Sequence, residues 1–405
     1  MYYIYVDNQP LYVPDLANDG FTVFDPIITE ELNKSGSLEF TIPPTNEKYN
    51  DLHHLKSIVT VYENNVEIWR GRVLNTTRDF YNNKKVYCEG ELSFLLDSVQ
   101  RNYHFEGKVS DLFKKFINSH NAEVEARKEF NVGQITIDDA SETIDYKSSA
   151  NQNTMEEIRS KLLDNHGGYL RTRFANGKRY IDYIEDYTGT SNQVIRLGEN
   201  LLDVEIIVNS EDLFTVLIPY GKMLNDKTGK RLTISSVNGG KDYIQSDAGV
   251  SNYGKIWKVK IWNGVKDASK LKVKAQKFLN RNIKSAVTLT IKAIDLHLLD
   301  VDTDRIEVGQ YIKVESEPHG INDNFQCSKI VLNMSNPDKS EFTFGLSRKS
   351  LTEKNVTVQS NMSAEVENNT SDIQIVSDDS SESMIDISDG LSSELFHICK
   401  LSGVG

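Results

Sequence analysis

The first part of the chain alternates between apolar and polar residues with a period of two, as half-buried β-strands do. The clearest example is the stretch EIWRGRVLNTTRDFYNNKKVYCEGELSFLLD, residues 67–97, in which two alternating runs flank the polar turn Asn82-Asn83-Lys84. Similar short runs are separated by turns such as Asn8-Gln9-Pro10 and Glu63-Asn64-Asn65. Several short strands with frequent turns predict a small β-barrel-like domain over residues 1–98.

The pattern changes to helical spacing near residue 99. The stretch VSDLFKKFINSHN has apolar residues three and four positions apart, with Ser110 in the place of an N-cap. In NTMEEIRSKLLDNHGGYL, Thr154 and Glu157 have the spacing of a capping box, and Gly167-Gly168 is expected to end the helix. Both stretches therefore predict amphipathic helices.

A hairpin follows the second helix. The stretch GGYLRTRFANGKRYIDYI has two strand-like runs around Asn176-Gly177, which is the strongest hairpin signal in the chain. Helices and hairpin together predict an α+β domain over residues 99–200. Strand patterns then return over residues 201–350, with one helix predicted at 267–282. The predicted fold class is α+β and mostly β, with two β-barrel-like domains and an inserted α+β domain.

The composition changes again over residues 351–405. Most of this segment is rich in Ser, Asn and acidic residues, and the stretch from Asn355 to Ser388 has no Lys or Arg. Such a composition is typical of a disordered tail or linker. Apolar residues nevertheless recur along it, which would suit a thin stalk formed by several chains. Both alternatives stay open.

The charge and the cysteines exclude several classes of protein. The net charge is −13, whereas a general nucleic-acid binder needs a positive field. The cysteines Cys88, Cys327 and Cys399 are few and far apart, so we expect free buried thiols instead of disulfides or a zinc site. The N-terminus lacks the features of a signal peptide, and no apolar run is long enough to predict a membrane-spanning segment. We expect synthesis in a cytoplasm.

The sequence contains only incomplete motifs for catalysis or metal binding. Asp300, Asp302 and Asp304 have the spacing of a calcium loop, but Arg305 and Tyr311 occupy positions that need Gly and Glu. Pairs of acids such as Asp138 and Asp139 carry no specificity in so acidic a chain. The eight histidines form no known catalytic signature, and we expect His166 to complement a helix C-terminus. We therefore predict no catalytic residue, no metal site and no cofactor.

One segment, residues 255–284, is strongly basic and also holds two tryptophans. It could be a polyanion groove with stacking platforms, the solvated face of a strand and helix, or a cationic patch that docks onto an acidic neighbour, another copy included. The solvated face is the simplest of the three. If the segment is an interaction surface, its candidate residues are Trp257, Lys258, Lys260, Trp262, Lys270, Lys274 and Lys277.

Four stretches resemble one known family. IWRGRV followed by VYCEGELSFLLD resembles the N-terminal region of phage minor structural proteins, also called tail-associated lysin or prophage endopeptidase tail proteins. These are related to the central hub of contractile-tail baseplates. HGGYLRTRFANGKRYIDYI, IEVGQYIKVES and CSKIVLNMSNPDKSEFTFGLS resemble further elements of the family in the same order. The resemblance covers about residues 1–350.

The resemblance implies a phage baseplate hub-like fold and a structural function. It implies a homotrimer whose two β-barrel-like domains pack around a three-fold axis, as a ring that continues the tail tube. The implied partners are a distal tail protein or tail tube protein, a tape-measure protein, and a central fibre, spike or receptor-binding protein, with transient passage of phage DNA. The implied location is the virion tail tip, after synthesis in the bacterial host cytoplasm.

Two other functions remain open from the sequence. Longer members of the family carry a peptidoglycan-cleaving or carbohydrate-binding region after the hub, whereas residues 351–405 contain no Cys/His signature of such an enzyme. An enzyme is therefore the less favoured alternative, as a tail-associated cell-wall hydrolase (peptidoglycan endopeptidase). A carbohydrate-binding adhesin is the third hypothesis.

Overall fold

The structure is a computed structural model that describes residues 1–15, 19–137, 144–148, 152–208, 213–224, 229–262, 264–284, 287–299 and 303–345. All of these lie in the first of two compact units, Met1–Ser347. The predicted tail or stalk, residues 351–405, lies outside the described residues. So do Cys399 and the acids Asp138, Asp139, Asp300 and Asp302.

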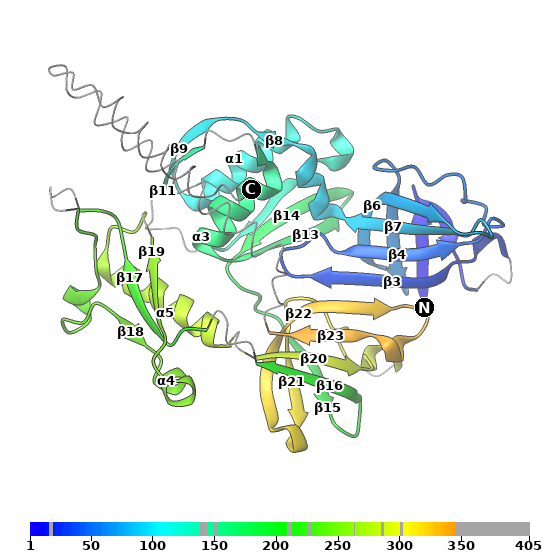
Figure 1. Cartoon of the computed structure of the whole chain (residues 1–405). Helices are drawn as coiled ribbons and strands as arrows, with labels where there is room; N and C mark the ends of the chain where they lie inside the picture. The colour runs from blue at the N-terminus through cyan, green and yellow to red at the C-terminus, as the bar shows by residue number, and fades with distance from the viewer. Residues whose placement is uncertain are drawn as a thin grey trace, which may run out of the picture. The chain divides into compact units, whose positions relative to one another are not determined.

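The described residues form one large sheet of thirteen strands (Figure 1). Its main path runs in the order β16-β20-β23-β22-β3-β4-β7-β6-β5-β1-β2, and β21 joins β15 to β22. The N-terminal strands are β1 (Tyr2–Val6), β2 (Gln9–Tyr12), β3 (Phe24–Glu31), β4 (Ser37–Ile42), β5 (Ile58–Glu63), β6 (Val66–Arg78) and β7 (Lys84–Gly90). The later strands are β15 (Thr190–Arg196), β16 (Leu201–Val208), β20 (Val287–Ala293), β21 (Tyr311–Ser316), β22 (Ile321–Asn333) and β23 (Glu341–Phe344).

The two strand-rich regions of the chain share this sheet through β3 and β22. These strands pair antiparallel, with Val331 opposite Thr29 and Leu332 opposite Ile28. Buried apolar residues from both regions, for example Ile28 and Ile330, belong to one hydrophobic core. The fold is mostly β with helices, as predicted. The two predicted β-barrel-like domains stay a prediction, and the sheet that joins them is continuous because the edge strand of each region is paired with that of the other. The domain boundaries at 98, 200 and 350 stay predictions.

The α+β region has its own core and small sheets. Its strands are β8 (Val99–Gln100), β9 (Tyr103–Gly107), β10 (Asn131–Ile135), β11 (Ile144–Ser148), β12 (Gln152–Asn153), β13 (Tyr169–Ala175) and β14 (Lys178–Ile184). Helix α1 (Val109–Asn121) buries an apolar stripe that includes Leu112, Phe113 and Phe116. The second predicted helix is α2 (Thr154–Glu157), a π-helical turn η4 (Ile158–Leu163) and α3 (Asp164–His166).

The predicted N-caps of both helices are wrong. Helix α1 follows Lys108 without a side-chain cap, so Ser110 is not one. Helix α2 is capped by Asn153, whose Oδ1 accepts a hydrogen bond from the Glu156 backbone N–H at 2.9 Å. Thr154 and Glu157 are fully buried instead, and the Glu157 carboxylate accepts a hydrogen bond from Ser148 Oγ at 2.7 Å. Partners inside the core hold these side chains away from the cap.

The predicted hairpin is confirmed. Strands β13 and β14 pair antiparallel from Tyr169 opposite Ile184 to Ala175 opposite Lys178. The tip residues Asn176 and Gly177 have φ angles of 52° and 71°. Two residues with positive φ are what a type I′ hairpin turn requires, and Asn-Gly adopts it most readily.

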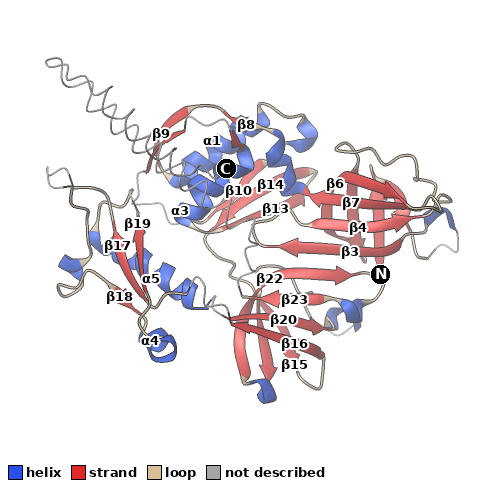
Figure 2. Cartoon of the chain, in the orientation of Figure 1, coloured by secondary structure: helices blue, strands red, loops and turns tan. Residues whose placement is uncertain are grey.

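The basic segment belongs to a small unit of sheet and helices within residues 213–284, here called the lysine-rich unit (Figure 2). It contains β17 (Val216–Tyr220), β18 (Ile244–Gln245), β19 (Trp257–Ile261), α4 (Asp247–Tyr253) and α5 (Ala268–Lys284). Helix α5 confirms the helix predicted at 267–282. The separate three-stranded sheet, in the order β18-β17-β19, is not predicted by the sequence pattern.

Candidate functional site

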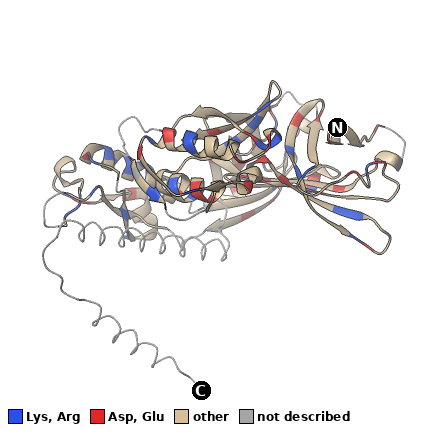
Figure 3. Cartoon of the chain, turned by 90° about the horizontal axis from the view of Figure 1, so that it is seen from above, with Lys and Arg blue, Asp and Glu red and all other residues tan. Residues whose placement is uncertain are grey.

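Helix α5 is amphipathic, and its lysines lie outside a buried stripe. Leu271, Ala275 and Leu279 are spaced four residues apart and are fully buried in the core of the lysine-rich unit. Residues at this spacing share one face of a helix. The lysines therefore fall on the remaining faces of α5. Lys and Arg gather in this unit while acidic residues dominate the chain as a whole (Figure 3).

The two tryptophans of the unit have different environments. Trp262 is only 6% exposed and packs edge-on against Phe278, with ring centroids 5.7 Å apart. It belongs to the core, which corrects its inclusion among the interaction residues. Trp257 is 51% exposed and contacts the Tyr243 ring at 5.1 Å. Only Trp257 can meet a partner without unfolding of the unit.

Two of the predicted lysines already have contacts in the α+β region. Lys277 Nζ donates to Glu185 Oε1 at 2.5 Å. Lys274 Nζ lies 3.4 Å from His166 Nδ1, and His166 Nε2 lies 3.1 Å from the Tyr146 hydroxyl. These contacts tie α5 to the α+β region. His166 thus contacts Tyr146 and Lys274 as well as standing in the last turn of α3, where we predicted a capping role.

The remaining predicted lysines lie on strand β19 and at the start of α5. Lys258 and Lys270 are exposed, and Lys260 is half-buried with its Nζ 5.9 Å from the centre of the Phe278 ring. The structure brings Trp257, Lys258 and Lys260 together on one strand and leaves Lys270 at the start of α5. Their role in binding a partner stays a prediction.

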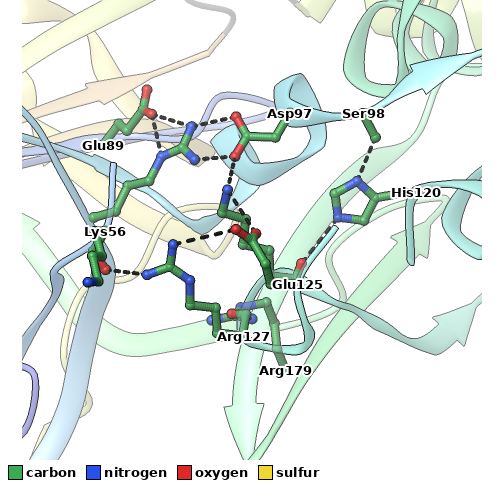
Figure 4. Close-up of polar contacts among 10 residues, drawn as sticks. Lys56, Glu89, Asp97, Ser98, His120, Glu125, Arg127 and Arg179 are labelled. Carbon is green, nitrogen blue, oxygen red and sulfur yellow. Dashed lines mark hydrogen bonds and ion pairs between the residues drawn. The ribbon is translucent and has the colours of Figure 1, made fainter. Parts of the chain in front are cut away.

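The charged residues of the stretch 67–97 form a buried junction between β6, β7 and the α+β region (Figure 4). Arg72 is 3% exposed and donates Nε–H to Glu89 Oε1 at 2.7 Å and an Nη2 hydrogen bond to Asp97 Oδ1 at 3.0 Å. Lys128 Nζ lies 2.8 Å from Asp97 Oδ2. Burial opposes ionisation of Asp97, but the hydrogen bonds from Arg72 and Lys128 hold its pKa below the usual range.

Arg179 of β14 forms the second ion pair of this junction. Its Nε–H donates to Glu91 Oε1 at 2.6 Å, and both side chains are buried. Its Nη1–H donates to the Arg127 carbonyl at 2.6 Å. The guanidinium groups of Arg72 and Arg179 lie 5.2 Å and 4.7 Å from the centre of the Phe94 ring. The side chains that pair with other charged groups of the chain are Arg72, Glu89, Glu91 and Asp97. The charged residues of the stretch 67–97 therefore serve to hold the fold together.

His120 lies beside the junction and is fully buried in α1. Its Nδ1 is 2.7 Å from Ser98 Oγ, and its Nε2 is 3.1 Å from the Lys128 carbonyl oxygen (Figure 4). Burial lowers the pKa of His120 from its ordinary value of 6.5, because the charged imidazolium loses hydration. The neutral imidazole is therefore the form that fits the folded chain.

This lowered pKa makes the junction sensitive to acid. The unfolded chain binds a proton on His120 at a higher pH than the folded chain. The contribution of neutral His120 to the free energy of unfolding is therefore fully present above about pH 6.5 and is lost as the pH falls below it. Replacing His120 by glutamine removes this titration. We expect the free energy of unfolding of the natural chain to fall more steeply than that of His120→Gln between about pH 7 and about pH 5. Urea unfolding at several pH values measures this, and parallel pH profiles would contradict it.

A group of charged side chains, here called the polar seam, lies where the N-terminal strands of the main sheet meet the later strands. It consists of Glu30, Glu63, His297 and Arg305. Arg305 lies at ion-pair distance, 4.0 Å, from both Glu30 and Glu63, and His297 Nε2 is 3.8 Å from Glu63. Glu63 is 4% exposed, and its Oε1 has no hydrogen-bond partner among the described residues. The sequence gives no signal that Glu63, His297 and Arg305 meet, because they lie far apart along the chain and share no local motif.

The seam opens into a large cleft of about 1840 Å³. Its walls come mainly from β6, β13 and β22 and from the β3–β4 turn. Several charged groups on these walls pair with one another: Arg70 donates Nε–H to Glu67 at 2.8 Å, and Arg171 Nε–H donates to Asp182 at 3.0 Å. The described residues contain no group of three or more His, Cys, Asp or Glu side chains that could hold a metal ion. Cys88 and Cys327 are free and buried, as predicted.

Part of the chain matches one known protein family. Residues 189–355 match the family described as Prophage endopeptidase tail. No curated protein matches the chain. Among the helices of the described ranges, none is long and apolar enough to cross a membrane.

Solved structures of prophage tail proteins share the fold. The tail protein gp18 of a Listeria monocytogenes EGD-e prophage is 17% identical, with a TM-score of 0.56 over 91% of this chain and 100% of that chain. The 43 kDa tail protein of prophage MuSo2 from Shewanella oneidensis is 12% identical, with a TM-score of 0.58 over 85% of this chain and 97% of that chain. A tail protein from Neisseria meningitidis MC58 is 14% identical, with the same TM-score and coverage. The fold is that of prophage tail proteins, and residues 189–355 of this chain match the model of the Prophage endopeptidase tail family.

Proposed function

We propose that the chain is a structural hub at the tip of a phage or phage-derived tail, where three copies close into a ring. The family of residues 189–355 and the fold of prophage tail proteins support a place in a tail. The main support for a hub is the continuous sheet, which contains strands from both halves of the chain. Among the described strands, its main path ends in two different edge strands, β2 and β16.

Different edges favour a ring over a simple pair. A contact between two unlike surfaces passes from copy to copy and closes if the rotation fits. Strand β2 is short and contains Pro10, which blunts its edge, whereas β16 is eight residues long and exposes Leu202 and Ile206. An open strand with exposed apolar side chains is suited to contact another protein.

The ring would join the tail tube or distal tail protein to a central spike, fibre or receptor-binding protein, beside the tape-measure protein. DNA would pass through it during delivery. The net charge of −13 suits this passage, because an acidic wall does not retain phosphates. The location that follows is the virion tail tip.

Antibody labelling of intact particles tests this function. Gold particles bound to antibodies against this chain should lie at the distal end of the tail in electron micrographs. An antibody against the tail tube protein, which labels the whole tail length, is the matched control. Labelling on the head or along the tube would contradict the proposal.

A second candidate function is cell-wall hydrolysis, and one observation favours it. Glu63 is a buried carboxylate whose Oε1 has no hydrogen-bond partner among the described residues, and it lines the large cleft next to His297. Hydrolases use such carboxylates as general acids or bases. A zymogram on peptidoglycan decides between the functions: clearing by the natural chain that disappears in Glu63→Gln would favour the enzyme, and no clearing by either chain favours the hub.

A further inference from the structure

The turn between β6 and β7 presents two aromatic side chains to solvent. The two strands pair up to Arg78 opposite Lys84, and the turn lies at the end of this hairpin away from Gly90, where β7 leads into the α+β region (Figure 1). Phe80 and Tyr81 in the turn are 92% and 75% exposed, the two highest values among the large apolar side chains of the described residues. A pair of aromatic rings left so exposed indicates an interaction site.

The turn is held in shape by polar contacts that do not involve these rings. The Asp79 carboxylate accepts hydrogen bonds from the backbone N–H groups of Tyr81 at 2.9 Å and Asn83 at 2.8 Å, and from Asn83 Nδ2 at 2.8 Å. The Asn82 backbone N–H donates to the Asp79 carbonyl at 3.1 Å, and the Tyr49 hydroxyl donates to the Asn82 carbonyl at 2.6 Å. The aromatic rings are therefore presented by a turn whose conformation is already fixed.

Rigid aromatic side chains of this kind suit the anchoring of a partner protein. The rings of Phe80 and Tyr81 contact each other edge-on, with centroids 5.3 Å apart. Aromatic side chains bury a large apolar area and lose little conformational entropy on binding, because each has only two side-chain torsions. A turn that is already ordered lowers the entropic cost of binding further. Both features are typical of residues that dominate the energy of an interface.

The charges beside the rings favour a protein over a lipid surface as the partner. Hydrogen bonds from Asn83 and Tyr81 hold the pKa of Asp79 below its usual range, so a charged carboxylate stands directly beside Phe80. A charged carboxylate enters a bilayer only at high cost, and the net charge of −13 opposes approach to anionic lipids. Arg78, on the other side of Asp79, is exposed. Arginine, like tyrosine, is enriched among the residues that anchor protein interfaces.

We propose that the β6–β7 turn docks into an apolar pocket, with a carboxylate at its rim, on a neighbouring tail protein other than this chain. The rings of Phe80 and Tyr81 fill the pocket, and Arg78 pairs with the carboxylate at the rim. This inference rests on the proposed hub, because a hub joins other tail proteins to one another. It names the residues of this chain that make one such contact and the chemistry of the surface that receives them.

Photo-cross-linking in intact particles tests the docking. The particles contain the whole chain with the photoreactive residue p-benzoylphenylalanine in place of Tyr81. Irradiation should join the chain to one other tail protein, and mass spectrometry should place the cross-link in a peptide with apolar residues and an acid. The same photoreactive residue in place of Lys178, which is exposed beside the tip of the β13–β14 hairpin, is the matched control and should not join that peptide. Cross-links only to lipid, only to copies of this chain, or to nothing overturn the docking.

Substitution of the anchors gives an independent readout. We expect Phe80→Ser with Tyr81→Ser to lower the amount of this chain that stays on purified particles at least about tenfold, because both rings are lost. Phe80→Tyr with Tyr81→Phe keeps two rings in the turn and should retain the natural amount. Arg78→Glu should lower the amount as well, because it places a second acid at the rim of the pocket. Full retention of the double-serine chain, with three copies by native mass spectrometry, overturns the docking and leaves the hub in place. A natural chain that stays a single copy contradicts the hub itself.

Discussion

Arg179→Met should lower the free energy of unfolding by about 3–5 kcal/mol. Arg179 and Glu91 form a buried ion pair with the Nε and Oε1 atoms 2.6 Å apart. Removing Arg179 leaves the buried Glu91 carboxylate with only the more distant Arg70, whose Nε lies 3.9 Å from Oε1. The Arg127 carbonyl also loses a donor that lies 2.6 Å away. Burial raises the pKa of Glu91 and Arg179 opposes this, so Glu91 of the variant should take up a proton more readily.

Chemical denaturation with a second change distinguishes the ion pair from packing. We expect Arg179→Met combined with Glu91→Leu to recover part of the lost stability, because no unpaired carboxylate remains in the core. Arg196→Met is the matched control, since Arg196 pairs with Glu315 at 2.8 Å on the surface and should change stability little. Equal losses in the single and the combined variant would mean that packing against Phe94, and not charge compensation, is the main contribution of Arg179.

Gly90→Ala should destabilise the chain by at least about 3 kcal/mol. A Cβ atom at Gly90 would lie 1.8 Å from the backbone carbonyl oxygen of Ser35. Neither atom belongs to a flexible side chain, so the β3–β4 turn and the end of β7 would have to separate. The shift would also strain the hydrogen bond from the Gly90 N–H to the Gly36 carbonyl, now 3.2 Å long.

Gly189→Ala is the control for this change. A Cβ atom at Gly189 would meet only Gln310 Cγ at 3.7 Å, an ordinary contact. Its thermal unfolding midpoint should stay within a few degrees of that of the natural chain. A Gly90→Ala chain with an unchanged midpoint would show that the turn can move away without loss of packing.

The sequence predicted local structure well where one strong local signal decides it. Asn176-Gly177 predicted a hairpin because few other residues adopt two positive φ angles, and the apolar stripe predicted α5. The capping box was wrong because Thr154 and Glu157 have partners in the core, Gln100 and Ser148, that lie outside the helix. Local spacing carries no information about such partners.

The remaining errors also concern long-range contacts. Pairing of β3 with β22 joins residues about 300 positions apart, and alternation within each strand cannot identify its neighbour. Trp262 and Trp257 stand in the same lysine-rich stretch, and only the packing of Phe278 against Trp262 separates a core residue from a surface one. Glu63, His297 and Arg305 meet across the seam without any shared motif.

The mass of the natural chain in solution shows whether three copies associate into the proposed ring. Native mass spectrometry at micromolar concentration should give a species of three copies, and averaged electron micrographs should show a closed ring. We expect this species to persist when the ionic strength is raised moderately, because salt does not screen apolar contacts and backbone hydrogen bonds between copies. A single copy across the whole concentration range, also after mixing with the tail tube or distal tail protein, would contradict it.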